Sequence, residues 1–554
     1  MADYEVYLEI ADDGRTMAHV LDLPGCNVRG ATREAVLRDL PVAIGAYLAW
    51  LGRHGEASRP DDEPVEIRVA GEAAGEGPFD PGDRAALFPP DREPISPEEM
   101  ERYYRLMDYN RDDLLAMVGK PSEELLDWRP FPGAYNLRRV LRHVGNGDQW
   151  YVSRIVPVET LPPEWEDDEG MAPFAYLEMS RRTAIDRLRQ LTPEERSGVF
   201  YPTAWTDHPD EPWTARKVLR RALEHEREHT GQAREVLAAR RRWILARMAA
   251  ERAGLLSSLL GLGEATLTEA RVGGEWTVKD VLAHIAAWDR WEQRNMRALV
   301  AGEAPVLAAT EDIERMNAGF VDAWRQQGLD AVVDELQEAR GDWVGWLESL
   351  PEEVFYAPHT FDGNDWSFSG LLRLYWEHDA EHRVQIRAWR EAEGLRGVSG
   401  TKSIMVASLE AARADLLRAA ALVPIEGRDS WPVCGEWTLK DVLGHVADWE
   451  AFAIEGVRMM AAGQEPDVEP VDDIEAWNRD HAEARREQPW DEVWDDLHRM
   501  RRTLMEVLRG VDESLLAPSF PFPWGVEGTP YDWLSVFVGH DREHARDFDL
   551  GGGG

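Results

Sequence analysis

The chain has 554 residues, which at about 150 residues per domain indicates three to four domains. Asp and Glu number 104 against 62 Lys and Arg, a formal charge of −42. A surface this acidic repels nucleic-acid phosphates and anionic lipid headgroups, so we expect no nucleic-acid partner and no membrane partner.

Cysteine content and the N-terminal segment indicate the compartment. Cys26 and Cys434 are the two cysteines of the chain and lie in different predicted domains, which excludes a disulfide framework. The N-terminus lacks a basic segment followed by an apolar core, and no apolar run approaches the length of a bilayer span. We therefore predict a cytoplasmic protein.

The first 72 residues predict a small α+β unit. Residues 4–10 alternate apolar and polar side chains, which is typical of a half-buried strand, and residues 17–23 form the returning strand. A helix is predicted over 32–51, with Thr32 as its cap, and a third strand over 65–69. The predicted order is ββαβ.

Two motifs in this unit, Asp22-Leu-Pro-Gly-Cys26 and Ala31-Thr-Arg-Glu-Ala35, together with the paired strands, resemble the HicB-like domain over residues 1–72. In antitoxins of that family the module binds a toxin and is joined to a DNA-binding domain. No DNA-binding domain is evident in this chain, so the resemblance implies the fold and not the antitoxin role.

The remainder predicts a mainly α protein. Residues 73–96 are rich in Gly, Pro, Asp and Glu, as expected for a linker. Amphipathic stretches then alternate with loops, and we predict four helices in each of three tandem bundles, over residues 97–242, 243–398 and 402–550. This architecture allows pairing of the bundles within or between chains.

Copies two and three share the clearest internal repeat. Glu275-Trp-Thr-Val-Lys-Asp-Val-Leu-Ala-His284 matches Glu436-Trp-Thr-Leu-Lys-Asp-Val-Leu-Gly-His445. Asp312-Ile-Glu-Arg-Met-Asn317 likewise matches Asp473-Ile-Glu-Ala-Trp-Asn478. Copy one is more diverged and lacks the second of these stretches.

Histidines recur at equivalent places in all three copies. Each copy ends in a His-acid-x-Glu-His motif, whose two imidazoles lie on one face of a helix. Each also has an upstream histidine seven residues after a good N-cap residue (Asn136, Thr277 or Thr438), so the second helix starts at the same phase. A four-helix bundle can bring helices two and four together and form three triads: His143, His225 and His229; His284, His378 and His382; His445, His540 and His544.

Three neutral imidazole nitrogens suit a divalent metal such as zinc, nickel or iron, and spacing does not choose among these ions. Three protein ligands leave coordination positions open for water or substrate, as in catalytic sites. The alternative is that these histidines face solvent or are satisfied by hydrogen bonds. Three matching triads with caps in register favour metal sites.

Three further sets of residues are candidates for supporting roles. One set could orient a ligand or move protons, and it contains Asp148, Asp289 and Glu450, five residues after the upstream histidines. A second set precedes the last histidine of each copy and is a candidate for the shell behind the metal: Glu228, Glu381 and Glu543. Asn317 and Asn478 either line a substrate pocket or satisfy buried backbone groups. Trp276, Trp288, Trp437 and Trp449 are interpreted as core residues.

The triads and the Glu-Trp-Thr-x-Lys-Asp motif resemble the DinB/YfiT-like family of four-helix bundles over residues 97–550, and copies two and three resemble its ClbS/DfsB branch. The resemblance implies a divalent metal on each triad. Characterised members include transferases and isomerases that use low-molecular-weight thiols, and resistance proteins that inactivate reactive electrophiles.

Three functions are compatible with this pattern. We favour a metal-dependent enzyme that detoxifies a small electrophilic substrate, by hydrolysis or by transfer of a low-molecular-weight thiol. The alternative is a non-catalytic protein that sequesters a toxic small molecule between its helices. An HxxEH metallopeptidase is the third hypothesis, although that motif belongs to a different architecture.

Overall fold

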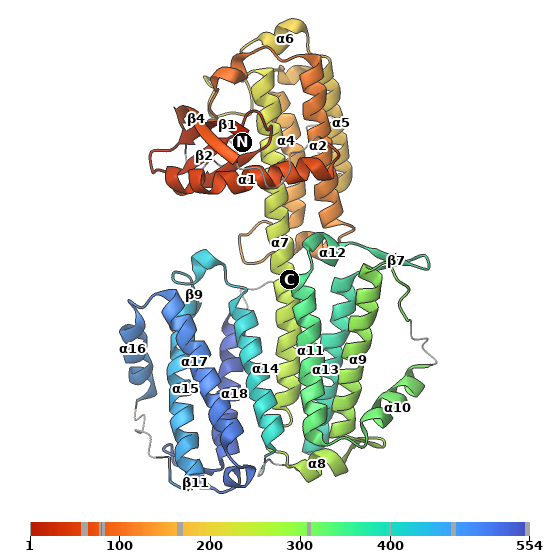
Figure 1. The fold of residues 1–554 in the computed structure, drawn as a ribbon, viewed down its shortest axis with the longest axis vertical. Helices are drawn as coiled ribbons and strands as arrows, with labels where there is room; N and C mark the ends of the chain where they lie inside the picture. The colour runs from red at the N-terminus through yellow and green to blue at the C-terminus, as the bar shows by residue number, and fades with distance from the viewer. Residues whose placement is uncertain are drawn as a thin grey trace. The chain divides into compact units, whose positions relative to one another are not determined.

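The computed structural model describes residues 2–56, 65–76, 79, 83–162, 170–306, 312–395, 397, 400–466 and 473–548. The chain divides into two compact units. One comprises Met1–Asp127 and Tyr135–Val236, and the other comprises Trp128–Ala134 and Leu237–Gly554 (Figure 1). The fold is mainly helical with a small N-terminal sheet, as predicted.

The N-terminal sheet has four strands in the order β3-β2-β1-β4. Neighbours are antiparallel except β1 and β4, which run parallel. The strands are β1 (Ala2–Ile10), β2 (Thr16–His19), β3 (Asn27–Gly30) and β4 (Val65–Ala74). The predicted ββαβ order missed β3, and the strand predicted over 17–23 ends at His19. A tight loop follows, in which Gly25 has a φ of +91° that favours glycine.

Helix α1 (Arg33–Arg53) packs on this sheet and begins at Thr32, whose side chain accepts a hydrogen bond from the Ala35 amide. Among the described residues, α1 is the one helix long and apolar enough for a membrane span, contrary to the expectation that no run approaches that length. The core helix of a soluble protein can have the same length and apolar composition. The buried side chains Val36, Leu40 and Ile44 of α1 lie in the core of the first unit.

The first bundle shares that core. Leu219 and Leu223 belong to the same hydrophobic cluster as Val6 and Leu8 of β1, so the N-terminal sheet and the bundle are stabilised together. The four main helices are α2 (Pro97–Val118), α4 (Leu137–Val152), α5 (Pro173–Arg189) and α7 (Ala215–Ser257). Short elements between them are η1 (Pro89–Arg92), α3 (Glu123–Asp127), η2 (Val158–Thr160) and α6 (Pro193–Ser197).

Helix α7 is continuous over 43 residues, so the repeat boundary that we placed at residues 242 and 243 falls inside it. From Leu237 onward it belongs to the second unit, where it is the first helix of bundle two. The other main helices of that bundle are α9 (Val278–Val300), α11 (Leu329–Ser349) and α13 (Phe368–Ala392). Smaller elements are α8 (Glu264–Glu269), β5 (Arg271–Gly273), β6 (Trp276–Thr277), α10 (Ile313–Trp324), α12 (Glu352–Tyr356), β7 (His359–Phe361) and β8 (Asn364–Trp366).

Bundle three repeats this plan within the same unit. Its main helices are α14 (Lys402–Ala420), α15 (Leu439–Ala461), α17 (Trp490–Gly510) and α18 (Pro530–Asp547). Smaller elements are η5 (Ile425–Gly427), β9 (Pro432–Cys434), β10 (Trp437–Thr438), α16 (Ile474–Arg485), η6 (Glu513–Leu516), β11 (Phe520–Pro521) and β12 (Glu527–Gly528). Ile404 and Ala407 of α14 share a core with Leu255 of α7 and Leu336 of α11, so bundles two and three pack against each other.

Each bundle contains a buried network of four charges, one from each main helix. In bundle two, Arg252 and Arg340 each contact both Asp289 and Asp379, with nitrogen-oxygen distances of 2.9–3.2 Å. Equivalent networks join Arg111, Asp148, Arg181 and Glu226 in bundle one and Arg413, Glu450, Arg501 and Asp541 in bundle three. The networks fix how the four helices face one another.

Candidate metal centres

The helix that carries each upstream histidine begins where the sequence predicts. Asn136, Thr277 and Thr438 are the N-caps of α4, α9 and α15, and each side chain accepts a hydrogen bond from the third residue of the helix. Thr277 and Thr438 also form capping boxes with the aspartates three residues later. These caps place the upstream histidine at the same phase in every bundle.

The structure brings the three histidines of each predicted triad together, with the candidate ligand atoms within 4.8 Å of one another. The second helix supplies one imidazole and the fourth helix supplies two. The Nε2–Nε2 distances are 3.0 Å for His143–His225, 3.0 Å for His284–His378, 3.1 Å for His378–His382, 2.9 Å for His445–His540 and 3.2 Å for His540–His544.

The last histidine of each triad has an oxygen acceptor three residues later. Nδ1 of His229 lies 2.9 Å from Gln232 Oε1, and Nδ1 of His382 lies 2.9 Å from Gln385 Oε1. Asp547 Oδ2 lies 2.9 Å from His544 Nδ1 in the third bundle. Because these oxygens accept, Nδ1 carries the proton and the Nε2 lone pair points toward the other imidazoles.

Burial favours the neutral form of most of these imidazoles. It lowers the pKa of six of them, and neighbouring imidazoles lower it further: His143, His225, His284, His378, His445 and His540. The resulting pKa is about 4 for His143, His378 and His540, about 3 for His284 and about 2 for His445. Neutral rings whose lone pairs converge repel one another unless a cation lies among them.

A divalent metal fits this arrangement. Two nitrogens that bind one ion at about 2.05 Å, with an angle of about 90–110° between them, lie about 2.9–3.4 Å apart. The Nε2–Nε2 distances above fall within this interval. His143, His225 and His229 would hold the first ion, and the other two triads would hold one ion each.

The three acids that follow the upstream histidines by five residues lie in the buried charge networks. Asp148, Asp289 and Glu450 pair with arginines in the buried charge networks and do not orient an imidazole, which corrects the role that we proposed for them. Burial alone would raise the pKa of Asp289, but Arg340 and Arg252 hold it below its ordinary value. A carboxylate fixed in this way is not free to accept protons.

The glutamates that precede the last histidines differ among the copies. Glu228 accepts a hydrogen bond from Asn27 at 2.6 Å and pairs with Arg29 at 2.5 Å, so its carboxylate is held by the N-terminal domain. Glu381 is exposed, and Glu543 lines the cavity beside the third triad. Glu228 likewise lines the cavity beside the first triad, so two of the three glutamates lie at a cavity next to a centre.

Asn317 and Asn478 both bind the tryptophan that follows the upstream histidine by one helical turn. The Trp288 indole donates to Asn317 Oδ1 at 2.8 Å, and the Trp449 indole donates to Asn478 Oδ1 at 2.9 Å. Asn478 also lines the third cavity. The two asparagines thus fix tryptophans beside the centres.

Cavities adjoin the first and third triads. The cavity at the third has a volume of about 1010 Å³ and is lined by His445, His540 and His544 together with Trp437, Trp449 and Phe537. The first triad adjoins a cavity of about 340 Å³, which Trp150 and Trp213 line beside His225 and His229. Trp437 and Trp449 pack against the hydrophobic cores, as the sequence suggested, and also form walls of the third cavity.

Sequence reasoning missed several residues of these centres. The acceptors Gln232, Gln385 and Asp547 recur three residues after the last histidine, and this spacing is a signal that could have found them. Cys434 was read only as evidence of compartment, yet its thiol lies with His544 and Asp547 in a further group of possible ligands. Copy two has Gly273 at the equivalent position, so Cys434 distinguishes the third centre.

A family model described as the DinB superfamily matches residues 106–233, 247–386 and 408–548. These matches cover more than half of the chain, and the chain therefore belongs to the DinB superfamily. Proteins of this superfamily typically bind divalent metals, in keeping with the three triads.

The N-terminal region is similar to UPF0150 protein Ta0767 of Thermoplasma acidophilum, with 36% identity over 66 residues. The match covers 12% of this chain and 94% of that relative. No solved structure matches the chain. The HicB-like domain and the ClbS/DfsB branch stay predictions from the sequence.

Proposed function

We propose that the protein is a divalent-metal-dependent enzyme that acts on small electrophilic compounds, by hydrolysis or by transfer of a low-molecular-weight thiol, and so detoxifies them. The observation that carries this proposal is the third centre, where three converging imidazoles line a cavity of about 1010 Å³. That volume accommodates a small organic molecule.

The residues of the third cavity suit this chemistry. Trp437, Trp449 and Phe537 offer apolar surface on which an organic substrate can pack, and the Asn478 amide fixes the Trp449 ring. A zinc, nickel or iron ion bound by the triad would lower the pKa of a water or thiol and polarise an electrophile. His544 is oriented for that role by Asp547.

The proposal is tested first by metal analysis. We expect the purified protein to contain bound divalent metal, and we expect each of three variants, in which one triad is replaced by alanine, to lose about one ion per chain. Circular dichroism of each variant checks that the helices remain folded. Metal content that is unchanged in all three variants would contradict the site assignment.

Sequestration is the alternative, because an aromatic cavity can also hold a toxic compound without reacting with it. The two functions separate when an epoxide is supplied in large molar excess, with and without a low-molecular-weight thiol. An enzyme consumes the epoxide over many turnovers, and this consumption stops in the triad variants. A sequestering protein stops at stoichiometric uptake.

A further inference from the structure

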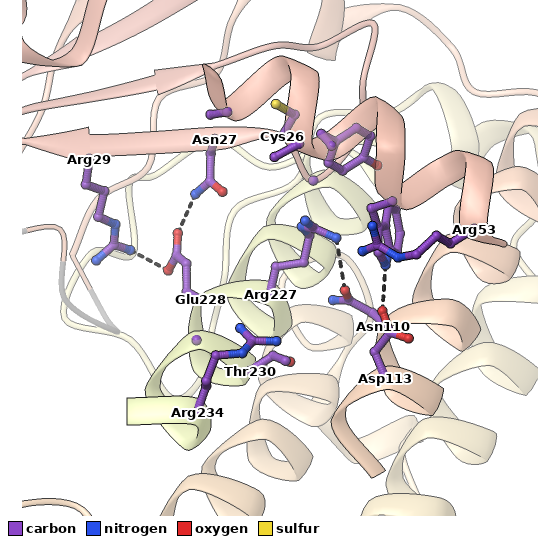
Figure 2. Close-up of a pocket in the computed structure, with 16 residues that line it drawn as sticks. Cys26, Asn27, Arg29, Arg53, Asn110, Asp113, Arg227, Glu228, Thr230 and Arg234 are labelled. Carbon is purple, nitrogen blue, oxygen red and sulfur yellow. Dashed lines mark hydrogen bonds and ion pairs between the residues drawn. The ribbon is translucent and has the colours of Figure 1, made fainter. Parts of the chain in front are cut away.

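A second kind of site lies in the first unit, away from the histidine triads. A cavity of about 510 Å³ is enclosed by the loop that contains Gly25 and Cys26, by α1, by α2 and by α7 (Figure 2). Its volume falls in the range of small-molecule pockets. Small side chains leave this space open, since Ala43 and Ala46 line the α1 wall.

The cavity is rich in arginine, although the chain carries a formal charge of −42. Four of its lining residues are arginines and two are acids. Both acids already have partners: Glu228 pairs with Arg29, and Asp113 accepts from the Trp50 indole at 2.6 Å and lies 3.1 Å from His54 Nε2. Glu228 offsets Arg29, and Asp113 interacts electrostatically with Arg227, so four arginines against two acids leave the lining with a net positive charge.

Arg227 has the most defined position of the three. Its guanidinium lies 4.7 Å from the centre of the Tyr47 ring and 4.3 Å from that of Trp50, and it donates to Asn110 Oδ1 at 3.3 Å. Among the described residues it makes no ion pair with an acid. Stacking on two aromatic rings orders a guanidinium while its remaining N–H groups stay available to a ligand.

Asn110 supplies a second, independent indication of a ligand. Its side chain is 3% exposed and lines the same cavity, yet Nδ2 has no hydrogen-bond acceptor among the described residues. A buried amide donor without an acceptor destabilises the fold, because the group has lost its hydrogen bonds to water without replacement. An oxygen atom of a ligand beside Arg227 would satisfy it.

We propose that this cavity binds a small oxyanion, the carboxylate or phosphate group of a low-molecular-weight compound. Arg227 and Asn110 would donate hydrogen bonds to the anion. Arg53 and Arg234, at the rim of the cavity in Figure 2, would help to balance its negative charge. The site does not depend on a metal. It shares Arg29, Glu228 and Gly231 with the cavity of the first triad, so an anion bound here lies beside that centre.

The test uses the full chain with two probes, inorganic phosphate and succinate, and measures binding by isothermal titration calorimetry at ionic strength matched with sodium chloride. We expect Arg227→Gln and Asn110→Leu each to weaken binding by about tenfold or more, since hydrogen bonds to charged groups contribute about 1.5–3 kcal/mol. Arg234→Gln, an exposed rim substitution, is expected to weaken binding less without affecting folding. The probe that binds more tightly shows whether the site prefers a phosphate or a carboxylate group.

Two controls make the result decisive. Arg182→Gln removes an exposed arginine of α5 outside the cavity and is expected to leave binding unchanged. A variant with His143, His225 and His229 replaced by alanine is expected to retain binding, which excludes phosphate held by a metal at the first centre. Equal affinity in the wild type and in the Arg227 and Asn110 variants, or no binding beyond that of chloride, would overturn the proposal.

Discussion

At the scale of single residues, the orientation of the last imidazole of each triad depends on an acceptor outside the triad. His382 is held by Gln385, and His544 is held by Asp547. Partners of this kind fix the tautomer and strengthen the ligand, and their removal typically costs about 10–100-fold in metal affinity.

Gln385→Leu is therefore expected to weaken zinc binding by about 10–100-fold at the second centre. The measurement is a competition titration with a chelating dye, in a chain whose first and third triads are replaced by alanine. Gln190→Leu, an exposed substitution at the C-cap of α5, is the matched control. Unchanged affinity in the Gln385 variant would show that this amide does not support the ligand.

Asp415 of α14 provides a pH prediction. It is 6% exposed, its nearest ion-pair partner, Arg542, is 3.9 Å away, and burial raises its pKa from 3.8 to about 7. Between these values the folded state keeps a proton that the unfolded state has released. The stability from this group is thus present below the ordinary carboxyl pKa and is lost as pH rises through about 7.

We expect Asp415→Asn to raise the free energy of unfolding at about pH 8, by up to about 4 kcal/mol at 1.36 kcal/mol per pKa unit. Near the ordinary carboxyl pKa the variant and the wild type should be equally stable. Urea denaturation at both pH values checks this. A gain of the same size at both would indicate a cause other than ionisation.

The residues that sequence reasoning found are those tied to helix periodicity. His378 and His382 lie on one face because they are four residues apart, and Thr277 sets the phase of His284. Cys434 could not be placed in this way, because its neighbours His544 and Asp547 come from a helix more than a hundred residues later. Such contacts depend on tertiary packing.

At the scale of helices, a buried four-charge network joins the four main helices of each bundle. Arg340 of α11 contacts Asp289 of α9 and Asp379 of α13, and all three are nearly inaccessible to solvent. Removing one partner of such a network leaves an uncompensated buried charge. The acid that follows the first histidine of each pair thus belongs to the packing of the bundle.

Arg340→Met is expected to lower the free energy of unfolding of the second unit by about 3–5 kcal/mol. Arg418→Met, which breaks a more exposed pair with Glu348, should change it by about 1 kcal/mol or less. Denaturant unfolding followed by tryptophan fluorescence compares the two. Similar effects of both substitutions would mean that the buried network contributes little.

The networks had a signal in the sequence that a single copy does not reveal. The arginine of the first helix and the acid of the second are separated by 37 residues in all three bundles. Long amphipathic helices were predictable from apolar spacing. Strand β3 was missed because its four residues are too few to show an alternation, and its pairing with β2 decides its conformation.

At the scale of the whole molecule, the N-terminal domain and bundle one form one folding unit. Gly25 of the domain lies against α7 so closely that a Cβ atom there would come within 2.9 Å of the Leu223 side chain. Their hydrophobic side chains form one cluster. The sequence indicated a separate domain and a linker, and the shared core was not visible in it because it joins distant segments.

Deletion of residues 1–76 is therefore expected to destabilise bundle one and to leave the second unit folded. Hydrogen exchange measured by mass spectrometry should show faster exchange in α2 and α4 and unchanged protection in α15 and α17. Gly25→Val in the full chain is a milder version, which should raise exchange in the same helices. Unaltered protection of α2 in the deletion variant would show that the bundle is stable alone.

The position of Cys434 gives the protein an intrinsic chemical reporter. Cys26 is 3% exposed and its pKa is raised to about 12 by burial, whereas Cys434 is half-buried and lines the third cavity. Burial and Asp547 raise the pKa of Cys434 as well, to about 11, so the difference in exposure decides which thiol reacts. A maleimide dye should therefore modify Cys434 selectively at mildly alkaline pH, at a rate that slows when a compound fills the cavity. Libraries of candidate substrates can be screened in this way before any reaction is known.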